Sequence, residues 1–85
     1  MAMNYFVYIL ECSDETLYTG ITTDPQRRLK EHNSSAKGAK YTKQRRPVSL
    51  VYKEMCEDRS SASKREYAIK KLSRQEKITL INKNS

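Results

Sequence analysis

The stretch that decides the fold is YILECSDETLYTGITTDPQRRLKEH, which occupies residues 8–32 of an 85-residue chain. It contains two runs rich in aromatic and aliphatic residues, and each run is typical of a strand. The polar residues 13–16 separate the two runs. A linker this short predicts an antiparallel hairpin. Tyr8 and Tyr18 then lie on neighbouring strands, and they are not directly opposite if the pairing is symmetric about the turn.

The first strand is predicted over residues 4–12 and the second over residues 17–22. Both alternating sets of side chains in residues 4–12 are apolar, which predicts a central strand covered on both faces. Gly20 interrupts the second strand. A glycine there marks a bulge or a place where another backbone, or a phosphate, comes close.

A helix is predicted to follow this hairpin. Asp24 and Pro25 form a strong start signal, with Asp as the N-cap and Pro at the first helical position. The helix is expected to end near residues 33–34, with Leu29 as its main apolar anchor. Arg28 and His32 are four residues apart and therefore share one face of the helix.

The remaining elements follow from the same local signals. Residues 35–46 are predicted to form a loop, and residues 48–55 a third strand that Pro47 precedes. A helix capped by Asp58 or Ser60 comes next, with its apolar stripe at Ala62, Ile69 and Leu72. Residues 73–76 read Ser-Arg-Gln-Glu, which is a capping box that opens a last helix.

The predicted order is strand, strand, helix, strand, helix, helix. It indicates an α+β fold with a small, mostly antiparallel three-stranded sheet flanked by helices. With 85 residues, the chain is expected to form one domain over residues 1–85.

Basic residues are concentrated after the hairpin. Residues 1–23 hold three acids and no Lys or Arg, so residues 24–85 hold 17 bases against 7 acids, a net charge of +10. An acid-free basic stretch attracts polyanions, although a merely solvated loop is the competing interpretation. An aromatic residue among the cations favours nucleic acid, because it can stack on a base. The candidate nucleic-acid-binding residues are Lys37, Lys40, Tyr41, Lys43, Arg45 and Arg46.

Glu66 is placed within the apolar stripe of the helix that Asp58 or Ser60 caps, four residues after Ala62 and three before Ile69. A carboxylate that faces the protein is costly unless a cation, a metal ion or several donors meet it. Two interpretations stay open: a salt bridge to an inward-reaching Arg or Lys, or a functional acid.

Several classes of protein are disfavoured by composition. No apolar run approaches the roughly 20 residues of a membrane span, and the N-terminus lacks the features of a signal peptide. Cys12 and Cys56 with one histidine cannot complete a tetrahedral zinc site without carboxylates. A cytoplasmic protein with no membrane partner is therefore expected.

Taken together, these residues resemble the GIY-YIG nuclease superfamily, whose first motif stands here as Phe6-Val7-Tyr8 and whose second stands as Tyr18-Thr19-Gly20. The resemblance covers nearly the whole chain. The chain is most similar to the small stand-alone bacterial members, and also to the catalytic domain of structure-specific endonucleases.

The resemblance implies a set of catalytic residues. Glu66 would hold one Mg²⁺ or Mn²⁺ ion, and Arg28 would neutralise charge that develops on the phosphate. Tyr8 would orient or deprotonate the attacking water, Tyr18 would brace the phosphate or the other phenol, and His32 would assist proton transfer or bond to a tyrosine. Which of Tyr8, Tyr18 and His32 is the general base stays open.

The implied function is metal-dependent hydrolysis of DNA phosphodiester bonds, in branched or repair-type structures. DNA is the expected partner, RNA is a further candidate, and a partner protein is one source of targeting. The alternative function is a non-catalytic nucleic-acid-binding module of the same fold.

Overall fold

A computed structural model of the chain describes residues 4–34 and 39–83. Its elements are β1 (Tyr5–Glu11), β2 (Leu17–Thr22), α1 (Pro25–Ser34), α2 (Lys40–Lys43), β3 (Ser49–Cys56), α3 (Arg59–Lys70) and α4 (Arg74–Lys83). This order confirms the predicted α+β fold. One prediction was wrong, because residues 35–46 were expected to be a loop and α2 lies within them. A helix of four residues is too short to leave a hydrophobic period in the sequence.

The three strands form one antiparallel sheet in the order β2-β1-β3, which confirms that the first strand is central. In the pairing of β1 with β2, Tyr8 lies opposite Gly20 and Leu10 lies opposite Tyr18. The two tyrosines are therefore diagonal neighbours on one face of the sheet. An irregularity in the pairing of β1 with β3 falls between Ile9 and Leu10.

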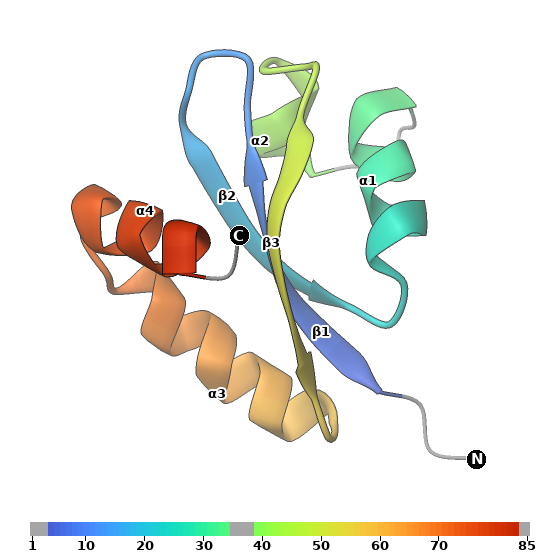
Figure 1. The fold of residues 1–85 in the computed structure, drawn as a ribbon. Helices are drawn as coiled ribbons and strands as arrows, with labels where there is room; N and C mark the ends of the chain where they lie inside the picture. The colour runs from blue at the N-terminus through green and yellow to red at the C-terminus, as the bar shows by residue number, and fades with distance from the viewer. Residues whose placement is uncertain (1–3, 35–38, 84–85) are drawn as a thin grey trace.

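Helices cover both faces of this sheet, as Figure 1 shows, with α1 and α2 on one face and α3 and α4 on the other. Val7 and Ile9 of β1 pack against Ala62 and Ile69 of α3. The alternate side chain Leu10 faces the opposite layer, in a second apolar cluster that Leu29 of α1 joins. Because strand side chains alternate, Tyr8 shares the face of Leu10 and points toward α1.

The helix starts confirm the predicted caps. The Asp24 carboxylate accepts a hydrogen bond from the Arg27 amide at 3.1 Å, and the Asp58 carboxylate accepts one from the Ser61 amide at 2.8 Å. Asp58, rather than Ser60, therefore caps α3. Both bonds of the predicted capping box at residues 73–76 form, at 2.9 and 3.1 Å. Such caps fix where each helix begins.

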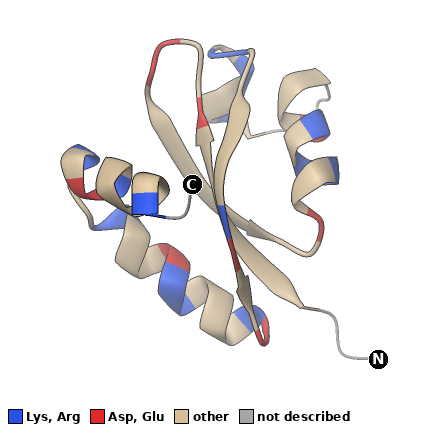
Figure 2. Cartoon of the chain, in the orientation of Figure 1, with Lys and Arg blue, Asp and Glu red and all other residues tan. Residues whose placement is uncertain are grey.

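The charges are unevenly placed over this framework (Figure 2). The turn between β1 and β2 is acidic, while Lys and Arg occur along α1 and between α2 and β3. Arg45 joins the two regions through an ion pair with Asp14, Nε to Oδ2, at 3.0 Å. Across residues 4–34 and 39–83, none of the helices has the length and hydropathy that crossing a bilayer requires.

Candidate active site

The site is centred on the phenol of Tyr8, which lies across the neighbouring strand at Gly20. A Cβ atom placed on Gly20 would stand 2.6 Å from the Tyr8 hydroxyl and 2.7 Å from the ring carbon that bears it. Only glycine leaves that space to the ring, and this explains the glycine in the second strand. The sequence predicted a bulge or the approach of a backbone or a phosphate at this position, whereas the structure places the Tyr8 side chain there.

Helix α1 supplies the polar partners of this phenol. With the helix start fixed by Asp24, Arg28 and His32 stand one turn apart on the side that faces the sheet. The His32 ring is fully buried, and the Arg28 side chain is 27% exposed. His32 Nε2 lies 2.9 Å from the Tyr8 hydroxyl. A side-chain hydrogen bond also links Arg28 to Tyr8.

Three aromatic rings pack around this point. The Tyr8 and Tyr18 ring centroids are 6.4 Å apart, and the Tyr18 and His32 centroids are 5.2 Å apart. Both distances lie in the range of favourable aromatic pairs. Tyr18 therefore packs against both Tyr8 and His32, with its ring tilted relative to each of them.

Burial sets the charge states of these groups. Removal from water raises the pKa of Tyr8 to about 12, although the hydrogen bond from Arg28 opposes this change. Burial, with a smaller contribution from the Arg28 charge, lowers the pKa of His32 to about 4. At neutral pH the phenol is therefore protonated and the imidazole uncharged. Arg28 is the cation whose charge acts on both Tyr8 and His32. Its Nη1 atom is 3.0 Å from Glu31 Oε1.

Glu66 approaches from the other layer of the molecule. It lies on α3, its side chain is 23% exposed, and its carboxylate pairs with Lys70 Nζ at 3.3 Å. The predicted salt bridge thus exists, but its cation belongs to the same helix and is mostly exposed. The Glu66 charge still makes a small contribution to the raised pKa of Tyr8. The structure thus joins Tyr8, Tyr18, Arg28 and His32 closely, whereas Glu66 lies on α3 and acts on Tyr8 through its charge alone.

The donor set around Glu66 is compatible with one hard divalent cation. Mg²⁺ is commonly held by one or two carboxylates, with water and substrate phosphate oxygens completing its shell. In the described part of the chain, no three His, Cys, Asp or Glu side chains gather as ligands. Glu66 is a partly exposed single carboxylate, and such a ligand fits an ion that shares its shell with substrate.

The predicted nucleic-acid-binding residues differ in their surroundings. Lys40 and Lys43 are exposed on α2, while Lys37 lies outside the described residues. Tyr41 stacks with Tyr18 at 6.0 Å between centroids, and the Arg45 guanidinium lies 3.9 Å from its ring centroid.

The two arginines of this stretch make contacts within the protein. Besides its ion pair, Arg45 donates from Nη1 to the Tyr41 carbonyl at 2.9 Å. Arg46 donates from Nε to the His32 carbonyl at 2.5 Å. Both therefore help to hold the segment between α2 and β3 against the site.

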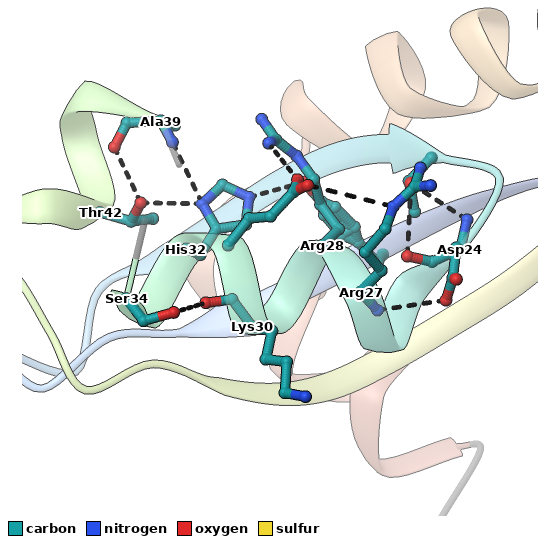
Figure 3. Close-up of polar contacts among 11 residues, drawn as sticks. Asp24, Arg27, Arg28, Lys30, His32, Ser34, Ala39 and Thr42 are labelled. Carbon is teal, nitrogen blue, oxygen red and sulfur yellow. Dashed lines mark hydrogen bonds and ion pairs between the residues drawn. The ribbon is translucent and has the colours of Figure 1, made fainter. Parts of the chain in front are cut away.

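Two polar residues of the site were missed by sequence reasoning. Thr42 is fully buried, with its Oγ1 atom 2.8 Å from His32 Nδ1, as the close-up in Figure 3 shows. Asn33 exchanges two hydrogen bonds with the backbone of Val48, at 3.0 and 2.7 Å, and so ties the end of α1 to the start of β3. A threonine among lysines and an asparagine near a helix end carry no pattern that would single them out.

Comparisons with known proteins agree with this arrangement. Residues 4–79 match the model of the GIY-YIG catalytic domain. A UPF0213 protein of Desulfotalea psychrophila is 69% identical over 77 residues, which are 91% of this chain and 70% of that protein. A UPF0213 protein of Syntrophus aciditrophicus is 61% identical over 99% of this chain and 95% of its own length.

Solved structures give the same result. The solution NMR structure of a UPF0213 protein from Bacillus halodurans is 49% identical, with a TM-score of 0.60, and the match covers 94% of this chain and 84% of that one. An E. faecalis protein, also solved by solution NMR, is 45% identical with a TM-score of 0.62, over 95% of this chain and 86% of that one. The extent of these matches shows that the chain belongs to the GIY-YIG family, among its small UPF0213 members.

Proposed function

We propose that this protein is an endonuclease that hydrolyses DNA phosphodiester bonds with the help of one divalent metal ion, in branched or repair-type structures. The observation that carries the proposal is the contact of the Tyr8 phenol with both His32 and Arg28, in the space that Gly20 leaves to the ring. Such a group of a phenol, an imidazole and a guanidinium suits proton transfer next to an anion. Membership in the GIY-YIG family supports the nuclease class.

Arg28 is the group proposed to stabilise the transition state. Its side chain is 27% exposed and interacts with both Glu31 and Tyr8. A fixed, permanently charged donor is worth more in a partly desolvated site than in water. We assign to Arg28 the neutralisation of the charge that develops on the phosphate oxygens.

Tyr8 is proposed to orient the attacking water and, as the phenolate formed by loss of its own proton to solvent, to accept a proton from that water. Burial raises its pKa to about 12, so positive charge near the phenol is needed before it can act as a base. Arg28 supplies part of that charge. Tyr18, packed on Tyr8 and His32, is proposed to brace the phenol and the phosphate.

Glu66 is proposed to hold the metal ion, Mg²⁺ or Mn²⁺. A bound divalent ion would polarise the phosphate and stabilise the leaving oxygen. Its charge would also oppose the repulsion that the Glu66 carboxylate exerts on the Tyr8 phenolate. The residue pair Tyr8 and Glu66 thus links the two faces of the fold in one proposed site.

DNA is proposed to reach the site over α2. Lys40 and Lys43 are exposed there, next to Tyr41, which stacks on Tyr18 of the site. Arg45 and Arg46, which also make contacts within the protein, and Lys37, which lies outside the described residues, are proposed as further DNA-binding residues. Each lysine that contacts a phosphate is expected to add about 0.9 to the slope of log affinity against log salt.

The test is cleavage of end-labelled branched and linear DNA with Mg²⁺, with Mn²⁺ and with EDTA. Wild-type protein is expected to cut only with metal present. Glu66→Gln keeps the size of the side chain and removes its charge, so we expect a rate lower by roughly 100-fold or more, partly recovered at high metal concentration. Glu57→Gln, an exposed acid just before α3, is the matched control and should cut at the wild-type rate.

One outcome would favour a second function. The exposed lysines of α2 support a nucleic-acid-binding module that does not cleave. Salt-dependent DNA binding that Lys40→Ala and Lys43→Ala weaken, with no cutting under any metal condition, would replace the endonuclease by that module. Cutting that persists at the wild-type rate in Glu66→Gln would contradict the proposed metal ligand.

A further inference from the structure

Thr42 is an inward-facing residue on an otherwise exposed helix. Helix α2 presents Lys40, Tyr41 and Lys43 to solvent, whereas the Thr42 side chain is fully buried. Its hydroxyl oxygen lies 2.8 Å from His32 Nδ1 and 2.9 Å from the Ala39 carbonyl oxygen. The hydroxyl has one hydrogen, so it donates to only one of these two acceptors.

The backbone amide of Ala39 shows whether His32 Nδ1 carries a proton. The Ala39 amide nitrogen is 3.3 Å from Nδ1, with its hydrogen directed at the ring, and Figure 3 shows this contact beside that of Thr42. A backbone amide always carries its hydrogen, and it cannot point at a second N–H. Nδ1 is therefore an acceptor without a proton.

The Thr42 hydroxyl completes this assignment. The Ala39 carbonyl already accepts hydrogen bonds from the backbone amides of Thr42 and Lys43, at 3.1 and 3.2 Å. The Ala39 carbonyl oxygen therefore has hydrogen-bond donors without the Thr42 hydroxyl, and the hydroxyl hydrogen can point toward Nδ1. Donation from Thr42 Oγ1 to Nδ1 also avoids bringing two lone pairs together at 2.8 Å.

An uncharged imidazole with a bare Nδ1 carries its proton on Nε2. Nε2 is the atom that contacts the Tyr8 hydroxyl, at 2.9 Å. We propose that Thr42, together with the Ala39 amide, is a positioning residue that holds His32 in the Nε2-protonated tautomer, so that His32 donates a hydrogen bond to the Tyr8 phenol oxygen.

This direction of bonding changes the role of His32. The Tyr8 oxygen then accepts hydrogen bonds from both His32 and Arg28, and two donors stabilise its phenolate form. They oppose the burial that raises the pKa of Tyr8. His32 thus assists by donating to Tyr8 and does not take the Tyr8 proton. The catalytic consequence rests on the proposed nuclease function, whereas the tautomer itself does not.

The tautomer can be read by NMR on the free protein, because the chain has a single histidine. Long-range ¹H–¹⁵N spectra at pH 7 of protein labelled with ¹⁵N-histidine should show a protonated Nε2 and an unprotonated Nδ1. A protonated Nδ1 would overturn the proposal, whether or not the protein cuts DNA. If His32 is protonated on Nε2 but the protein does not cut DNA, the nuclease function alone would be contradicted.

The matched variants are Thr42→Val, which removes the hydroxyl at almost constant volume, and Thr42→Ser, which retains it. We expect Thr42→Val to shift the Nδ1 resonance and to lower kcat about tenfold with KM unchanged, the rate equivalent of one hydrogen bond. Thr42→Ser should restore both readouts. A Thr42→Val protein with the wild-type Nδ1 resonance and wild-type kcat would overturn the positioning role.

Discussion

Replacing Gly20 with alanine is expected to lower the rate of DNA cleavage at least 100-fold and the free energy of unfolding by about 1–3 kcal/mol. The new methyl group would stand 2.6 Å from the Tyr8 hydroxyl, so the ring must move. Because Tyr8 is buried and bonded to His32, it has little room to move without losing that bond. Chemical denaturation and single-turnover cleavage measure the two effects.

A double-mutant cycle separates this contact from the backbone. Gly20 does not have a positive φ, so its conformation accepts alanine. In a Tyr8→Leu protein, which lacks the ring, Gly20→Ala should be neutral or stabilising by about 0.4–1 kcal/mol. Equal destabilisation in both backgrounds would show that the Tyr8 ring is not what the glycine accommodates.

The second large effect is expected at Arg28. Arg28→Ala should reduce kcat by about 10²–10³-fold, the usual cost of removing one preorganised donor from a transition state. The neighbouring Arg27 gives a close control, because it has the same charge and also faces Glu31, at 4.0 Å. Its side chain is 62% exposed, and Arg27→Ala should cut within about twofold of wild type.

The comparison of the two arginines isolates geometry from net charge. Both variants remove one positive charge from the same helix, so a general loss of DNA affinity would affect them alike. Of the two arginines, Arg28 is the one whose side chain interacts with Tyr8. Wild-type activity in both variants would exclude Arg28 from the chemistry. The same loss of activity in both variants would point to electrostatic attraction of DNA instead.

Much of the fold could be predicted from sequence because its signals are local. Asp24 with Pro25, and the capping box at residues 73–76, fix helix starts through side chains a few residues from the amides they cap. The apolar residues on both faces of β1 place that strand at the centre of the sheet. These features need no knowledge of how distant segments meet.

The parts that could not be predicted depend on distant contacts. Helix α2 has only four residues, and Thr42 acquires its importance from His32, ten residues earlier. Arg45 looks like a phosphate ligand in the sequence, but its pairing with Asp14 depends on two loops meeting at one end of the sheet. Local sequence patterns show neither the contact of Thr42 with His32 nor that of Arg45 with Asp14.

The candidate site shows the same division. The spacing of Arg28 and His32 on one helix, and of two tyrosines on a hairpin, could be read directly, and the structure places all four together. The direction of the bond between His32 and Tyr8 could not be read, since it depends on the Ala39 amide. The sequence also does not show on which face of the sheet the helix that carries Glu66 packs.

The central claim is that the Tyr8 phenol is the group on which hydrolysis depends, and Tyr8→Phe tests it most directly. Tyr52→Phe is the matched control, because Tyr52 is also buried and bonded through its hydroxyl, to Glu54, but on the opposite face of the sheet. With both variants verified as folded, we predict that single-turnover cleavage of branched DNA falls at least 100-fold in Tyr8→Phe and stays near wild type in Tyr52→Phe. Wild-type cleavage by Tyr8→Phe would contradict the claim.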